Sequence, residues 1–169
     1  DHGFSFPLNY FERYKLTSWP QFLDDFSDSN LSLNPPWFGD DSVYTIVDVG
    51  GNFQLRSNKL LTNSTYCVST PNTLVNDAQW EFSVRLLFNT SSANFVDIYL
   101  CSDQANVFSP GVNGYFVRIG GTTDEVSLYK SVVGVKTKII DGIDGTTNYS
   151  TNELKVKVKC TASGEWILE

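Results

Sequence analysis

The stretch GYFVRIGGTTDEVSLYK, residues 114–130, has the pattern of two β-strands joined by a glycine turn. Before the turn, Val117 and Ile119 alternate with Phe116 and Arg118, and a similar alternation resumes after it. A period of two with one apolar face predicts half-buried strands, and the intervening glycines favour a hairpin. The polar face of this hairpin carries Phe116, Arg118, Ser127 and Tyr129.

The same alternation extends outward to the neighbouring segments WEFSVRLLF (80–88), FVDIYLC (95–101) and ELKVKVKC (153–160). In the second of these, the pattern places Cys101 on the polar face with Asp97 and Tyr99. About ten such segments are separated by short turn signals, and no helical period persists for three turns. The sequence therefore predicts an all-β fold, a two-sheet antiparallel β-sandwich.

Charge and hydropathy exclude several classes of function. The net charge of −7 and pI of about 4.6 argue against binding to nucleic acid or to an anionic membrane surface. The chain lacks an apolar run of membrane-spanning length, so we do not expect it to be membrane-embedded. Residues 1–20 lack the pattern of a signal peptide and form an N-terminal extension of unknown role.

The three cysteines, Cys67, Cys101 and Cys160, match no zinc-binding spacing. Their odd number leaves at least one without a disulfide partner within the chain. Two interpretations stay open: three small apolar residues in the core or at its edge, or one disulfide and one thiol.

Several segments together resemble a known group of proteins: FLDDFSDSNLSLNPPWFGDDSVYTI, NFQLRS, STPN, WEFSVRLLFNTSSANFVDIYLCSDQANV and NGYFVRIGGTTDEVSLYK. In this order they resemble the N-terminal region of large secreted or surface proteins of Bacteroidota, of the type that carries a lamin-tail domain. The resemblance implies a concanavalin A-like jelly roll and a location outside the cell or on the bacterial cell surface.

The resemblance covers roughly residues 22–166, and we expect the jelly-roll domain to occupy residues 21–169. The segment KVKVKCTASGEWILE reads as a strand, a turn and the start of another strand. We therefore expect the domain to lack its C-terminal strands here and to continue beyond Glu169 in the natural protein.

Jelly rolls of this type include glycosidases, which need two suitably spaced carboxyl groups. No paired-carboxylate motif occurs along the predicted strands: Asp124 and Glu125 are adjacent and would point to opposite faces. The one histidine, His2, lies in the N-terminal extension. We therefore expect no enzymatic activity.

Glycan binding is the alternative that the polar faces favour, because aromatic rings stack on sugars and charged side chains bind hydroxyl groups. If the strands share one sheet, the candidate residues form one patch: Glu81, Arg85, Asp97, Tyr99, Phe116, Arg118 and Tyr129. Cross-strand aromatic and ion pairs also stabilise a sheet that binds nothing, so a solvated sheet is the competing interpretation.

Acidic residues cluster in DDFSDSN, where Asp24, Asp25 and Asp28 provide oxygen ligands of the kind that calcium prefers. The resembled fold often holds a structural calcium near its first strand, so this cluster is the candidate metal site. Asp and Asn are also ordinary turn-forming residues, which is the competing interpretation.

The sequence thus predicts a non-catalytic recognition or adhesion module that binds a polysaccharide or another surface protein. Two alternatives stay open: a structural module of a larger secreted protein without its own ligand, and a jelly roll of the glycosidase type.

Overall fold

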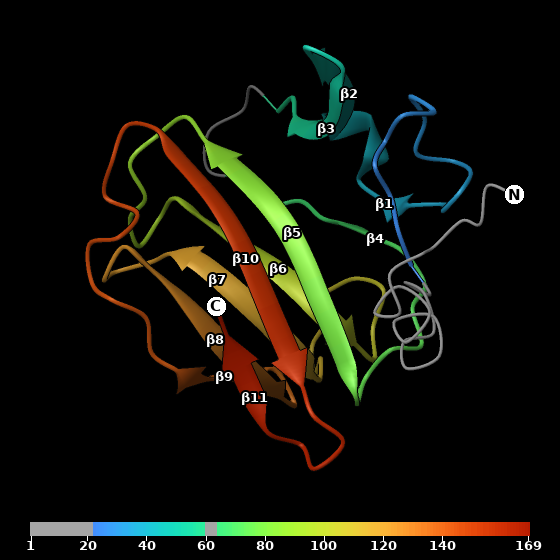
Figure 1. The fold of residues 1–169 in the computed structure, drawn as a ribbon. Coiled ribbons are helices and arrows are strands. Elements are labelled where there is room, and N and C mark those ends of the chain that lie inside the picture. Colours follow the sequence, from blue (N-terminus) through green and yellow to red (C-terminus); the bar gives the residue numbers. More distant parts are fainter. Residues whose placement is uncertain (1–21, 60–63) are drawn as a thin grey trace, which may run out of the picture. The chain divides into compact units, whose positions relative to one another are not determined.

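The computed structural model describes residues 22–59 and 64–169 (Figure 1). The chain divides into two compact units, Asp1–Thr70 and Pro71–Glu169. The predicted domain of residues 21–169 therefore spans parts of both units. The extension predicted at residues 1–20 lies outside the described residues.

The described part of the first unit contains short strands and one 3-10 helix, η1 (Asp41–Val43). Strands β1 (Phe38–Gly39) and β4 (Val68–Ser69) pair antiparallel. Strands β2 (Tyr44–Val49) and β3 (Asn52–Ser57) form an antiparallel hairpin. Its two turn residues, both glycines, have positive φ angles, which is the backbone geometry that two-residue hairpin loops require.

The larger sheet of the second unit is a four-stranded antiparallel meander, in the order β6-β7-β8-β9. Its strands are β6 (Phe95–Ser102), β7 (Gly114–Gly120), β8 (Glu125–Val132) and β9 (Val135–Ile140). Strands β7 and β8 are the two strands predicted from GYFVRIGGTTDEVSLYK, and that prediction is confirmed. The turn between them requires glycine at position 120. Gly120 has a φ of 102°, and the Thr90 side chain fills the space that a Cβ atom would need.

The smaller sheet of this unit has the order β11-β10-β5, and all of its pairs are antiparallel. Its strands are β5 (Ala78–Leu86), β10 (Asn152–Cys160) and β11 (Trp166–Leu168). The long strands β5 and β10 are drawn side by side in Figure 1 and pair along their whole length.

Both sheets of the second unit contribute to one hydrophobic core. The buried members of this cluster are Leu86, Val156 and Val158 from the smaller sheet and Leu100, Val117, Ile119 and Leu128 from the larger one. Trp80, Phe82 and Val84 pack against it, as the alternation in WEFSVRLLF predicts. Burial of these alternating apolar residues is the main stabilising contribution to the unit.

The all-β prediction is confirmed: the described residues form several antiparallel sheets, and no closed barrel is present among them. The finer prediction, a sandwich with jelly-roll topology and missing C-terminal strands, stays a prediction.

Candidate functional site

A row of stacked aromatic rings crosses three strands of the β6–β9 sheet. Tyr99 on β6, Phe116 on β7 and Tyr129 on β8 lie directly opposite one another in the strand register. The ring centroids of Tyr99 and Phe116 are 4.7 Å apart, and those of Phe116 and Tyr129 are 5.2 Å apart, with interplanar angles of 22° and 14°. Each such pair is worth roughly 0.5–1.5 kcal/mol beyond the area it buries.

A cluster of charged side chains lies beside this row. Arg118 donates two hydrogen bonds to Asp97, from Nε to Oδ1 at 2.7 Å and from Nη2 to Oδ2 at 2.8 Å. Lys136 Nζ lies 3.2 Å from the same Oδ2. The side chains of Arg118 and Asp97 are only 19% and 13% exposed. These hydrogen bonds raise the pKa of Arg118 despite the opposing effect of burial, and the paired, planar geometry fixes both side chains.

The cations of this cluster lie over the aromatic rings. The Arg118 guanidinium carbon is 4.1 Å from the ring centre of Phe95 and 5.2 Å from that of Tyr129. Lys136 Nζ is 4.9 Å from the ring centre of Phe116, which has no exposed surface. Cation–π attraction therefore adds to the ion pairs in holding these side chains in place. Phe116 supports the rings beside it and does not itself reach solvent.

A second charged cluster surrounds Glu125, whose side chain is 1% exposed. Ser127 Oγ donates a 2.7 Å hydrogen bond to Glu125 Oε1, and Lys138 bridges Glu125 and Asp141. Burial disfavours the charged form of Glu125, but the hydrogen bonds, led by that from Lys138, outweigh it and lower its pKa from 4.5 to about 2. Glu125 is therefore a carboxylate at any physiological pH.

The Tyr99 hydroxyl is buried and forms no hydrogen bond with any residue that the structure describes. Burial is the main cause that raises the pKa of Tyr99 to about 12, and the nearby charge of Asp97 is the second. The hydroxyl is therefore a protonated donor whose hydrogen-bonding capacity is not used by the described side chains.

These side chains lie on the face of the sheet opposite to the hydrophobic core, and we call it the polar face. It comprises Phe95, Asp97, Tyr99, Phe116, Arg118, Glu125, Ser127, Tyr129, Lys136 and Lys138. Five of the predicted binding residues belong to it: Asp97, Tyr99, Phe116, Arg118 and Tyr129.

The other two predicted binding residues, Glu81 and Arg85, do not belong to the polar face. Both lie on β5, which pairs with β10 in the smaller sheet and not with β6. Arg85 forms an exposed ion pair with Glu153 at 3.1 Å, and Glu81 accepts a hydrogen bond from Gln79. The expectation of one patch of seven residues is therefore wrong, because the loop after β5 carries the chain into the other sheet.

Five members of the polar face were not among the predicted binding residues: Phe95, Glu125, Ser127, Lys136 and Lys138. The two lysines had a usable signal, since they alternate with Val135 and Thr137 in the sequence, although no strand was predicted over Val135 and Lys136. Lys136 lies over the ring of Phe116 and Lys138 pairs with Tyr129, and both positions depend on the register of β9 against β8, which the alternation does not give.

The carboxylates of the candidate calcium cluster are occupied by local hydrogen bonds. Asp24 accepts from the backbone N–H of Phe26 and from Trp37 Nε1, both at 2.7 Å. Asp25 and Asp28 each accept from the backbone N–H two residues further along, as turn-forming aspartates do. Among the described residues, no group of three or more His, Cys, Asp or Glu side chains is arranged to hold a metal ion. A calcium site here stays a prediction.

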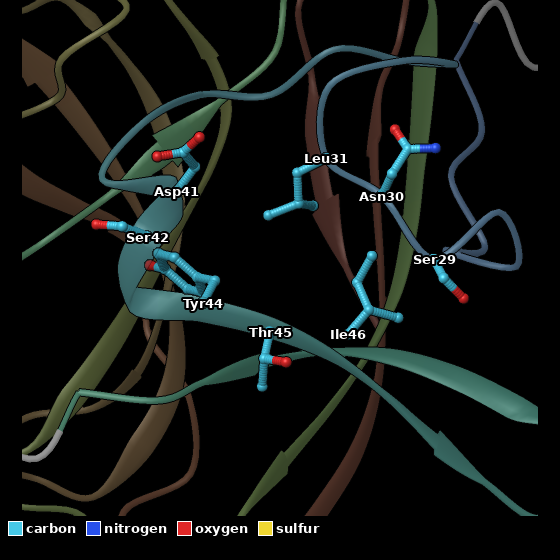
Figure 2. Close-up of a pocket in the computed structure, with 8 residues that line it drawn as sticks. All are labelled: Ser29, Asn30, Leu31, Asp41, Ser42, Tyr44, Thr45 and Ile46. Atoms are coloured by element: carbon cyan, nitrogen blue, oxygen red, sulfur yellow. The ribbon is translucent and has the colours of Figure 1, made fainter.

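An open depression of about 350 Å³ lies in the first unit. It is lined by Ser29, Asn30, Leu31, Asp41, Ser42, Tyr44, Thr45 and Ile46 (Figure 2). The polar side chains in Figure 2 do not converge on one point, and Asp24, Asp25 and Asp28 are not among the lining residues. The polar face is therefore the better candidate site.

No protein-family model matches this chain, and comparisons with curated proteins and with solved structures find no match either. Within the described residues, no helix has the length and hydropathy to cross a membrane. The side chains of the polar face therefore provide the main evidence for what this chain does.

Proposed function

We propose that the protein is a non-catalytic recognition module that binds a neutral polysaccharide on the polar face of its β6–β9 sheet. The observation that carries the proposal is the stacked row of Tyr99, Phe116 and Tyr129, flanked by the fixed pair of Asp97 and Arg118. Sugar rings have apolar C–H faces and polar edges, and this arrangement offers the partly exposed rings of Tyr99 and Tyr129, held by the buried ring of Phe116, beside fixed donors and acceptors.

The balance of charge on this surface favours an uncharged ligand. The two clusters contain three cations, Arg118, Lys136 and Lys138, and three carboxylates, Asp97, Glu125 and Asp141. Because each cation faces a carboxylate, an acidic or basic polymer would gain little net attraction. Hydroxyl groups can bind to such pairs without separating them.

The protonation state of Glu125 supports the non-catalytic part of the proposal. A glycosidase needs a carboxylic acid whose raised pKa keeps it protonated, so that it can donate a proton to the leaving group. Glu125 has a lowered pKa, and Asp97 is held by Arg118 and Lys136. Neither residue is suited to the role of general acid.

The proposal includes the two-sheet sandwich with jelly-roll topology and a location outside the cell or on the cell surface. The hydrophobic core shared by the two sheets of the second unit supports the sandwich. The resemblance to secreted proteins of Bacteroidota supports the location. The competing role is that of a structural module without a ligand. It is favoured because the charged groups on this face already pair with one another.

Affinity electrophoresis in gels containing β-glucan, xylan, mannan or an acidic pectin tests the proposal. We expect one of the neutral polymers to retard the wild-type protein and Tyr129→Ala to weaken that binding about fivefold, equivalent to about 1 kcal/mol. Tyr149→Ala is the matched control, because Tyr149 is 63% exposed and lies outside the polar face.

Tyr129→Ala also removes the contact with Phe116, so its thermal unfolding must be recorded alongside. Equal retardation of both variants would contradict the assignment of the site. If none of the neutral polymers retards the wild-type protein, the result would favour the structural module.

A further inference from the structure

The β6 strand contains an irregularity that changes the direction of Cys101. Tyr99 pairs with Phe116, but Cys101 pairs with Tyr115, so the register shifts by one residue between them. A β-bulge of this kind places two residues opposite one and reverses the alternation beyond it. Cys101 therefore lies on the face of Tyr115, which is the core face, and the prediction that it shares the polar face with Asp97 and Tyr99 is wrong.

Cys160 reaches the same core from the other sheet. It is the last residue of β10, alternates with the core residues Val156 and Val158, and is 3% exposed. Its partner across the strand pair is Trp166 on β11.

An aromatic contact joins these two positions across the space between the sheets. The rings of Tyr115 and Trp166 are stacked with their centroids 4.3 Å apart and an interplanar angle of 24°. Tyr115 lies opposite Cys101 in one sheet, and Trp166 lies opposite Cys160 in the other. Because cross-strand partners have Cβ atoms about 5 Å apart, both thiols lie beside the same aromatic pair, on facing sheets.

We propose that Cys101 and Cys160 form a disulfide bond that links the two sheets of the second unit. Both are thiols in this structure. Facing sheets are on average about 10 Å apart, whereas disulfide-linked Cα atoms are about 4.4–6.8 Å apart, so the two strands must approach locally. Cys101 follows a bulge and Cys160 ends its strand, which are the places where a backbone can shift with least disruption of pairing.

The oxidation balances with a small disulfide, such as oxidised glutathione, as the electron acceptor. One cysteine thiolate attacks it, forms a mixed disulfide and releases one glutathione thiolate. The second cysteine thiolate then attacks the protein sulfur of the mixed disulfide and releases the other glutathione. The two protein thiols have lost two protons and two electrons, and the glutathione disulfide has been reduced to two thiols.

Burial raises the pKa of both Cys101 and Cys160. The thiolate is the reactive form, so oxidation of the folded protein is slow. The pair is expected to form readily when the chain folds in an oxidising environment, such as that met by an exported protein.

Refolding of the denatured, reduced full chain in a glutathione redox buffer tests the proposal. After alkylation of the remaining thiols and digestion with trypsin, the three cysteines fall in separate peptides, residues 60–85, 86–118 and 160–169. We expect mass spectrometry to find 86–118 linked to 160–169 and 60–85 alkylated. Cys101→Ser and Cys160→Ser should abolish the link, and Cys67→Ser should leave it unchanged.

Thermal unfolding gives an independent measurement. The bond closes a loop of about 60 residues, so the oxidised protein should melt on the order of 10 °C above the reduced one. Cys67→Ser should retain this shift and Cys160→Ser should lose it. Full alkylation of 86–118 and 160–169 after oxidative refolding, or a link through 60–85, would overturn the proposal.

Discussion

Replacement of Glu125 by glutamine removes one charge from the buried cluster of the polar face with almost no change in shape. Glu125 is 1% exposed and its pKa is lowered from 4.5 to about 2 by interactions with Lys138 and Ser127 that outweigh burial. A shift of this size corresponds to about 3 kcal/mol of stability at neutral pH. We therefore expect Glu125→Gln to lower the free energy of unfolding by about 2–3 kcal/mol at pH 7.

The sign of the pH dependence follows from the same shift. Because the pKa of Glu125 is lower in the folded state, its contribution is fully present above about pH 4.5. It is then lost progressively as the pH falls through about 2. The difference between wild type and Glu125→Gln should therefore shrink between these two pH values. Urea unfolding at pH 7 and pH 3, followed by tryptophan fluorescence, measures this difference.

Glu153→Gln is the matched control. Glu153 also pairs with a cation, Arg85, but their side chains are 68% and 48% exposed. Solvent weakens such pairs, so the same chemical change should cost less than about 0.5 kcal/mol at pH 7. Equal losses in the two variants, or a Glu125→Gln difference unchanged between pH 7 and pH 3, would refute the reasoning.

Two further predictions concern side chains outside the polar face. Thr90→Val should lower the free energy of unfolding by about 1–3 kcal/mol, because the buried hydroxyl of Thr90 bonds to Asp124 at 2.7 Å and to Thr147 at 2.8 Å. Urea unfolding of the variant measures this, and a loss below about 0.5 kcal/mol would contradict it. Asp24→Ala should speed hydrogen exchange at the Trp37 indole N–H, which loses its 2.7 Å acceptor. Unchanged exchange at that group would count against the contact.

The sequence predicted the strands well where the pattern is local. The alternation of Val117 and Ile119 with Phe116 and Arg118 depends on side chains that point to opposite faces of one strand. The structure places these residues on the expected faces of β7. The all-β fold follows from the same local pattern, as does the face of its own strand on which each of Tyr99, Arg118 and Tyr129 lies.

The sequence did not show which strands share a sheet. Glu81 and Arg85 have the expected alternation, but they lie on β5, whose partner is β10, about 70 residues further along the chain. The bulge before Cys101 escaped prediction for a related reason, since it depends on pairing with β7. The position of Lys136 over the buried ring of Phe116 also depends on pairing, because β9 lies two positions from β7 in the sheet.

Chemical-shift mapping by NMR tests the proposed binding surface most directly. Isotope-labelled protein is titrated with soluble oligosaccharides derived from β-glucan, xylan and mannan, and the perturbed backbone and aromatic resonances are assigned. We expect saturable shifts centred on Tyr99, Arg118 and Tyr129, with Lys136 and Lys138 at the edge of the affected region. Shifts centred on β5 and β10, or no shift on the β6–β9 sheet with any of these sugars, would contradict the proposal that the polar face is a glycan-binding site.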